Sequence, residues 1–191
     1  MKLCFCDVET TGIDRKLCEV IQISMIFENT ETGKSTEREW KCRPRNADDL
    51  AIYEQGALDK TGLTIEKIKT FPNPDETYVK VFSTLGHCVD KYNSNDKMFF
   101  LAYNADFDYS FLRSWSEAAG EKYFGSFFHF PFIDVMQTAA LVTMGIRHKV
   151  KNFTLKNICE LFDIEFDEEK AHEASYDNRK TMELYHKLTE G

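Results

Sequence analysis

Residues 3–12 read LCFCDVETTG, a short apolar strand that carries two acids, Asp7 and Glu9. Side chains alternate between the two faces of a strand, so these two acids point the same way. An unpaired charge is costly in a core strand, and two like charges on one face repel each other. The stretch therefore predicts a buried strand, and the two acids near its end indicate a functional role.

The composition is that of an ordinary globular chain, and we expect residues 1–191 to form a single domain. Six cysteines without zinc-finger spacing, and a start without a secretory signal, favour a reduced, cytoplasmic protein. No apolar run approaches the roughly 20 residues that span a bilayer, so no membrane is expected. The net charge of −8 argues against broad binding to a duplex, but not against an enzyme that holds a strand end through metal ions.

Hydrophobic periodicity predicts an α/β chain with a mixed sheet. Beyond the first strand, strands are predicted at 19–28, 36–44, 97–104 and 127–134, with a hairpin turn at 29–34. Helices are predicted at 47–60, 75–92, 106–120, 135–145, 153–163 and 173–189, a loop at 63–76, and helix caps at Asp75, Asp106 and Asp134. Hairpins join the first strands and helical crossovers join the later ones. This order is that of a ribonuclease-H-like fold, a mixed five-stranded sheet flanked by helices.

Two further acids head the buried stripes of predicted helices. Asp108 is followed at helical spacing by Phe111, Leu112 and Trp115, and Asp177 by Thr181, Leu184, Tyr185 and Leu188. Each acid alone is equally explained as a cap or as a buried group with a hydrogen-bond partner, but three separate elements repeat the pattern. Four carboxylates at one core edge need cations to relieve their repulsion, and oxygen-only ligands favour Mg²⁺ or Mn²⁺ over zinc. Two such ions serve phosphoryl transfer.

His172 precedes Asp177 by five residues, which is about 140° on a helix. The two side chains cannot share a helical face, so we expect His172 on the loop or first turn that leads into the last helix. An imidazole beside a metal centre suits a general base that takes a proton from water. We interpret the other histidines as structural or surface residues: His87, His129, His148 and His186.

The acidic motifs resemble those of the DEDDh 3′-to-5′ exonucleases, the family that includes proofreading subunits of DNA polymerases and oligoribonucleases. DVETTGI (7–13), AYNADFDYSFL (102–112) and HEASYDNRKT (172–181) match its three motifs in order, and the resemblance spans nearly the whole chain. A sister class has Tyr four residues before the last Asp. Glu173 stands there in this chain, so the histidine class is the one that fits.

The resemblance implies a metal-dependent exonuclease that hydrolyses phosphodiester bonds at single-stranded or mismatched 3′ ends and releases nucleoside 5′-monophosphates. It implies that two divalent cations, Mg²⁺ or Mn²⁺, are held by Asp7, Glu9, Asp108 and Asp177, with His172 as the base. It places the 3′-terminal nucleotide at Thr10, Thr11, Gly12, Ile13 and Asn104. Two departures concern the surface that holds the strand: Tyr103 replaces the usual His, and 57–64 lacks the His that usually precedes its Gly.

Two stretches keep alternatives open. The basic stretch 147–157 is either a solvated loop or a phosphate contact. The stretch FFHFPF (127–132) is either a buried strand or an exposed patch of a proofreading-type module whose main role is docking to a polymerase or another partner. The sequence does not distinguish DNA from RNA, or a homodimer from a chain that works alone.

Overall fold

The strand predicted from residues 3–12 is β1 (Lys2–Thr10), and it lies at the centre of a five-stranded sheet. In the computed structural model, which describes residues 1–189, the strand order is β3-β2-β1-β4-β5. On one side of β1 the pairing is antiparallel, with β2 (Val20–Asn29) and then β3 (Lys34–Lys41). On the other side it is parallel, with β4 (Phe99–Ala102) and then β5 (Ile133–Asp134). The predicted mixed sheet is confirmed.

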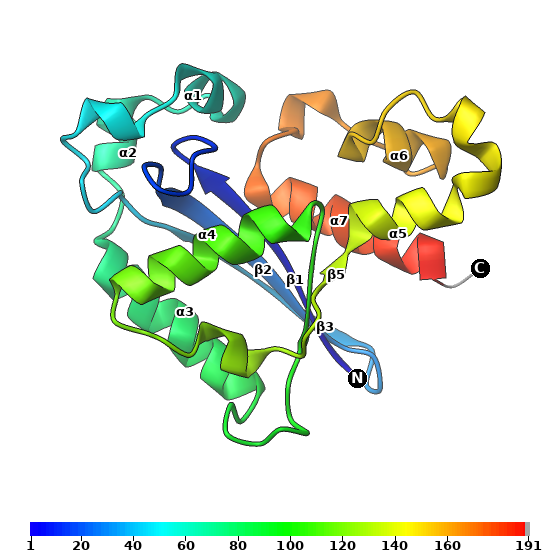
Figure 1. The fold of residues 1–191 in the computed structure, drawn as a ribbon, viewed down its shortest axis with the longest axis horizontal. Coiled ribbons are helices and arrows are strands. Elements are labelled where there is room, and N and C mark those ends of the chain that lie inside the picture. The colour runs from blue at the N-terminus through cyan, green and yellow to red at the C-terminus, as the bar shows by residue number, and fades with distance from the viewer. Residues whose placement is uncertain (190–191) are drawn as a thin grey trace.

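Helices cover both faces of the sheet, as Figure 1 shows. One face carries α3 (Pro74–Cys88) and α4 (Ala105–Ala118), and the other carries α5 (Val135–Val142), α6 (Leu155–Leu161) and α7 (Ala174–Thr189). The short helices α1 (Gln55–Thr61) and α2 (Ile65–Lys69) lie beyond the carboxyl end of β1. Short 3₁₀ helices lie in the connections at η1 (Leu50–Ile52), η2 (Phe124–Phe127), η3 (Met144–Lys149) and η4 (Glu168–Lys170). Within residues 1–189, no helix is both long and apolar enough to cross a membrane.

The alternation of β1 divides the core into two layers. Cys4, Cys6 and Val8 pack into a cluster with α3 and α4. Leu3 and Phe5 pack into a second cluster with α5, α6 and α7. Both clusters share one sheet, so the acids that follow Phe5 on the second face extend an apolar layer to its solvent-facing end.

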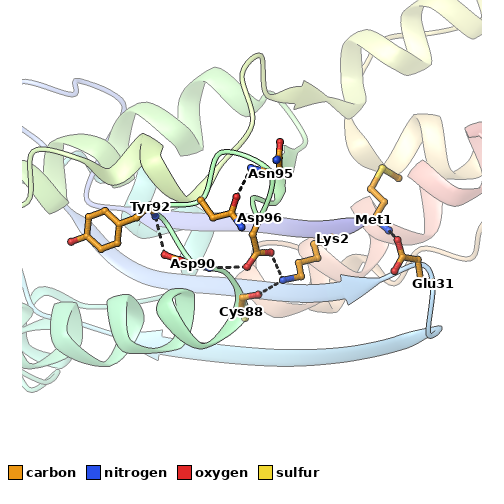
Figure 2. A network of polar contacts seen from close by, with 9 residues as sticks. Met1, Lys2, Glu31, Cys88, Asp90, Tyr92, Asn95 and Asp96 are labelled. Atoms are coloured by element: carbon orange, nitrogen blue, oxygen red, sulfur yellow. Dashed lines mark hydrogen bonds and ion pairs between the residues drawn. The ribbon is translucent and has the colours of Figure 1, made fainter.

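The amino end of β1 is tied down by polar contacts, far from the acids (Figure 2). Lys2 Nζ donates to the carbonyl of Cys88 at 2.8 Å and forms an ion pair with Asp96. Asp96 also accepts the N–H of Asp90, and the terminal amine of Met1 pairs with Glu31. The loop that leads into β4 is therefore anchored to β1 before the two strands begin to pair.

The predicted strand at 127–134 is mostly wrong. Residues 124–127 form a 3₁₀ turn, Phe128 makes a single bridge to Met98, and only Ile133–Asp134 pairs as a strand. Pro131 has no N–H to give to a ladder, which shortens the strand. The structure buries Phe127 and Phe128 in the core next to α4 and leaves Phe130 92% exposed. The stretch is therefore neither a full strand nor a broad apolar patch.

Two local predictions on the way to α3 are also wrong. The predicted loop at 63–76 contains α2, whose first turn is capped by the Thr64 hydroxyl accepting the N–H of Lys67. The cap of α3 is Asn73 rather than Asp75, because Pro74 occupies the first helical position and the cap is the residue before it, two residues earlier than predicted. Asp75 instead pairs with Arg45.

Asn178, on α7, ties that helix to the two central strands. Its side chain is fully buried, and Nδ2 donates at 3.1 Å both to the carbonyl of Phe5 and to the hydroxyl of Ser24. The pair of bonds fixes the height of α7 above β1 and β2, one residue after Asp177. Because removing the amide would take these hydrogen bonds away from buried polar groups, the bonds stabilise the fold as well as the helix position.

We expect Asn178→Ala to lower the free energy of unfolding by about 1–3 kcal/mol, the cost of buried polar groups left without partners. Chemical denaturation of the metal-free protein measures it. Asn46→Ala is the matched control, because Asn46 is exposed and its side chain makes no hydrogen bond in the described structure. Equal stability of the two variants would contradict the role assigned to Asn178.

Candidate active site

The carboxyl half of β1 extends past its parallel neighbour. Pairing with β4 stops at Phe5, while pairing with β2 continues to Thr10. The N–H of Val8 would then face no strand, and the carboxylate of Asp108 takes the place of one: Oδ1 accepts this N–H at 3.0 Å in a buried position. A side chain of α4 is thereby hydrogen-bonded to the backbone between Asp7 and Glu9.

Asp7 and Glu9 share the face of Leu3 and Phe5, as the period of a strand requires. They lie opposite Ser24 and Gln22 of β2, and a bulge follows directly after Glu9. Both acids are half-buried. The strand thus presents two carboxylates at the rim of the core and then turns away.

The helix that bears Asp108 starts where the sequence predicts, but its cap differs from the prediction. Asn104 adopts a left-handed conformation at the start of α4 with its side chain exposed, and Asp134 Oδ2 accepts the N–H of Ala105 at 3.1 Å. The other oxygen of Asp134 accepts the N–H of Gln137, which confirms the predicted cap of α5. Asp106 caps nothing and pairs with Arg15 on the surface, because its side chain points outward from the first turn.

Asp177 lies in the first turn of α7, and His172 lies on the loop before it, as expected. His172 is exposed and has a φ of 68°, a conformation uncommon for a side chain with a Cβ. Its backbone N–H donates to Asp177 Oδ2 at 3.2 Å. Oδ1 of Asp177 is buried and has no hydrogen-bond partner within residues 1–189. One oxygen of this acid is held by the loop and the other is left for a ligand.

The four acids reach this place from three elements. β1 supplies two, and α4 and α7 supply one each from opposite faces of the sheet. The two helices therefore do not lie together above the strand. The acids meet at the open end of the strand layer, the end of β1 that its parallel neighbour leaves uncovered.

Burial and mutual repulsion dominate the electrostatics of the acids. Burial raises the pKa of Asp7 and of Asp108 well above that of an ordinary aspartate, and neighbouring carboxylates raise both further. The pKa of Glu9 is raised to about 8, mainly by burial and also by Asp177, with Lys60 acting in the opposite direction. Burial also raises the pKa of Asp177, against the N–H of His172. Without cations, the site binds protons instead.

The donor set fits hard divalent cations. As the side chains lie within residues 1–189, no group of three or more His, Cys, Asp or Glu residues is close enough together to hold a metal ion. The four acids offer only oxygen ligands, which suit Mg²⁺ or Mn²⁺. The buried, unpartnered oxygen of Asp177 is an acceptor that such a cation would satisfy, and the raised pKa values show charges that lack compensation.

A pocket of about 370 Å³ is lined by one of these acids, Glu9, while Asp7, Asp108 and Asp177 are not among its lining residues. Of the predicted site residues, it brings together Glu9, Thr10, Gly12, Ile13 and His172. Thr11 and Asn104 are not among its lining residues. Thr11 is fully buried, and its hydroxyl accepts the N–H of Glu19, so its side chain supports the loop from behind.

Sequence reasoning missed six residues that line this pocket, and three of them have side chains that can contact a ligand by charge or stacking: Glu54, Lys60 and Phe107. Phe107 stands between two acids of a recognised motif, which was an available signal. Glu54 and Lys60 come from α1 and the residue before it, where the sequence shows only a helical stretch without a motif. No pattern in residues 47–60 indicates which of its side chains face β1.

A comparison of the sequence with protein-family models matches the family RNase_T, described as Exonuclease, over residues 4–185. Ribonuclease T of Hahella chejuensis is 29% identical over 184 residues, covering 94% of this chain and 79% of that protein. Ribonuclease T of Enterobacter sp. (strain 638) is 31% identical over 188 residues, covering 94% and 77%. These relatives match over most of their own length.

Solved structures share the fold. E. coli exonuclease I in complex with single-stranded DNA superposes with a TM-score of 0.77 at 20% identity, over 99% of this chain and 40% of that chain. A 3′-exonuclease that recognises the 3′ end of a histone mRNA stem-loop superposes with a TM-score of 0.74 at 15% identity, over 99% and 81%. The chain thus spans less than half of exonuclease I, and the ribonuclease-H-like prediction is confirmed at the level of the fold.

We expect the metal-free protein to lose stability as the pH rises from about 5 to about 8.5. The folded acids have raised pKa values, so the folded state binds more protons than the unfolded state in this window, and stability falls as those protons leave. Thermal unfolding in EDTA should show a Tm lower by roughly 5 °C at the upper pH, given ~2–4 °C per kcal/mol for a chain of this size.

Glu9→Gln is the variant that tests the cause. It removes one titrating group without changing shape, so it should flatten the decline and raise the Tm at pH 8.5 in EDTA. Adding Mg²⁺ at pH 8.5 should raise the Tm of the wild type more than that of the variant. If the Tm did not change with pH, or if Glu9→Gln lost as much stability with rising pH as the wild type, the charge of Glu9 would not be the cause.

Proposed function

This chain belongs to the RNase_T exonuclease family and is a DEDD-type 3′-to-5′ exonuclease, and from that premise we propose that it releases nucleoside 5′-monophosphates from single-stranded or mismatched 3′ ends. The observation that carries the proposal is the convergence of four acids at the uncovered end of β1, beside a pocket that reaches His172. E. coli exonuclease I of the same fold is complexed with single-stranded DNA, which supports a single-stranded substrate. We also propose that residues 1–191 act as one exonuclease domain, because one sheet carries both core clusters.

Asp7, Glu9, Asp108 and Asp177 would hold two divalent cations, Mg²⁺ or Mn²⁺. When bound, such ions supply Lewis-acid stabilisation of the charge that develops on a phosphate during displacement. Asp108 gives one oxygen to the N–H of Val8, and Asp177 gives one to the N–H of His172. Each helix acid is thus oriented by a backbone donor and keeps its second oxygen for a cation.

His172 would act as the general base toward the attacking water. It lines the same pocket as Glu9, and its imidazole is exposed. The bond from His172 to Asp177 uses the backbone N–H, and the His172 ring makes no hydrogen bond within residues 1–189, so the ring can turn toward the substrate.

The loop after β1 would receive the 3′-terminal nucleotide. Thr10 Oγ1 donates to the carbonyl of Gly12 at 2.6 Å, and Thr11 is held by Glu19, so both threonines shape the loop. The N–H of Gly12 has no acceptor among residues 1–189 and is open to a ligand. Ile13 is 73% exposed at the pocket rim, where it can pack against a base. Asn104, at the start of α4, would contact the strand further along.

The docking alternative has less support. Phe130 is the one largely exposed aromatic ring of its candidate stretch, 127–132, and one exposed ring is ordinary on a protein surface. A polymerase partner and a homodimer stay predictions. The basic stretch lies near the site, because Tyr103 donates its hydroxyl to the carbonyl of Phe153 at 2.8 Å. That bond holds residues 150–154 beside the start of α4.

We expect the purified chain with Mg²⁺ or Mn²⁺ to shorten 5′-labelled single strands from the 3′ end, and EDTA to stop it. Asp108→Asn and Asp177→Asn should each lower the rate by at least about 10²-fold, the scale of a lost electrostatic group at a reaction centre. Asp106→Asn is the matched control, two residues away on the same helix but on the surface. Matched DNA, RNA and mismatched duplex substrates, compared on gels, would define the preference.

An Asp108→Asn variant with the rate of the wild type would contradict the role of that acid. A loss in Asp106→Asn equal to that in Asp108→Asn would show that the helix, rather than the carboxylate, is what matters. A wild-type chain that shortens none of the strands with either metal would overturn the proposed function itself.

We expect His172→Gln to lower kcat by roughly 10²–10⁴-fold, the usual contribution of a general base, with little change in strand binding. The acidic limb of the kcat–pH profile should also disappear, because the group that must be deprotonated is gone. Single-turnover rates and fluorescence anisotropy separate the two effects. An unchanged rate, or a rate loss matched by equally weakened binding, would contradict the assignment.

A further inference from the structure

Lys60 is the one lysine or arginine among the residues that line the pocket beside the acids. It lies in the last turn of α1, and its side chain is exposed. No carboxylate within residues 1–189 pairs with it, although ion pairs are common elsewhere on this acidic chain. Its charge acts on the site, because it lowers the pKa of Glu9 against the larger effect of burial.

The position of Lys60 is set by a latch between α1 and the loop after β1. The N–H of Glu54 donates to the carbonyl of Thr11 at 2.7 Å. In return, Glu54 Oε1 accepts the N–H groups of Ile13 at 3.1 Å and Asp14 at 3.3 Å. A Cβ on Gly12 would lie 2.4 Å from Cδ of Glu54, so the loop and the latch are packed closely. The Glu54 carboxylate is therefore bonded to backbone amides and does not form an ion pair with Lys60.

The other walls of the pocket are suited to a base and not to an anion. Ile13 is exposed at one side, and Phe107 is half-buried at another. Apolar and aromatic side chains hold bases by stacking, which tolerates any base. Two carboxylates line the pocket, and of these Glu54 is bonded to amides while Glu9 repels phosphates unless cations cover it. Apart from His172, the proposed base, Lys60 is the lining side chain that can attract a phosphate.

Resting on the proposed function, we propose that Lys60 is a substrate-anchoring residue whose ammonium group binds a backbone phosphate at the 3′ end of the strand. An ammonium is a compact point charge that contacts phosphate without reading sequence. The contact holds the strand before reaction, whichever base is terminal. It also offsets, at the mouth of the site, the repulsion expected between a polyanion and a chain of net charge −8.

Strand binding can be measured apart from cutting. Ca²⁺ replaces Mg²⁺, fluorescence anisotropy reports the Kd of 5′-labelled single strands with each of the four terminal bases, and gels verify that the strands stay intact. We expect Lys60→Ala to raise the Kd roughly tenfold, equally for all four ends, as loss of a charged hydrogen bond would. The slope of log Kd against log salt should fall by about 0.7, the loss of one phosphate contact on a single strand.

Two variants control the experiment. Lys60→Arg keeps the charge and should bind within about threefold of the wild type. Lys67→Ala removes an exposed lysine from the neighbouring helix α2, outside the pocket, and should leave both Kd and salt slope unchanged. In Mg²⁺, Lys60→Ala should raise KM and leave kcat within about threefold, which separates an anchoring role from an effect on the acids.

Several outcomes would overturn the inference: an unchanged Kd in Lys60→Ala, a loss confined to one terminal base, or a fall in kcat without weaker binding. If the wild type cuts strands while Lys60→Ala binds normally, the anchoring role fails and the proposed function stands. If the wild type binds strands through Lys60 but cuts none with Mg²⁺ or Mn²⁺, the proposed function fails and the anchoring role stands.

Discussion

The hydrogen bond from the N–H of Val8 to Asp108 is the contact on which the site depends. β4 is short, so the carboxyl half of β1 has an unpaired edge, and a buried N–H there would be costly without an acceptor. The carboxylate that meets this need belongs to α4, and the same bond holds it between Asp7 and Glu9. A structural requirement of the sheet thereby brings an acid from one face of the sheet to the acids of the other face.

The same arrangement sets the chemistry. Charges that are half-buried among other charges have few ways to be stabilised, and protons or cations are the two available here. The raised pKa values of the acids show how far the metal-free site relies on protons, and an enzyme that works near neutral pH must replace them. Repulsion between the acids thus lowers the stability of the metal-free fold and raises the gain from binding a divalent cation. Asn178 and the loop before α7 hold the geometry against that repulsion.

The sequence predicts what periodicity and local chemistry can express. The shared face of Asp7 and Glu9, the buried stripe headed by Asp108 and the cap at Asp134 follow from spacing alone, and the structure has them. Prediction from the sequence fails where a contact between distant parts of the chain determines the position of a side chain or a helix. Asp106 pairs with Arg15 from a distant loop, and the opposite approach of α4 and α7 depends on which face each crossover takes. Asn178 carries no signal at all, because its bonds reach residues far away in the chain.

The acids of the site and the opposite wall of its pocket are held in place by different contacts. The difference determines which residues can be substituted without disturbing the acids. The acids on the helices are oriented by backbone donors, the N–H groups of Val8 and His172, which substitutions of neighbouring side chains leave in place. The wall opposite them comes from α1, whose attachment to the loop after β1 runs through the backbone N–H and the carboxylate of Glu54. Residues beyond that attachment, such as Lys60, can vary without disturbing the acids. In the proposed function, β1 and its backbone contacts would therefore set the chemistry, while a short helix bonded to the loop through Glu54 would anchor the strand.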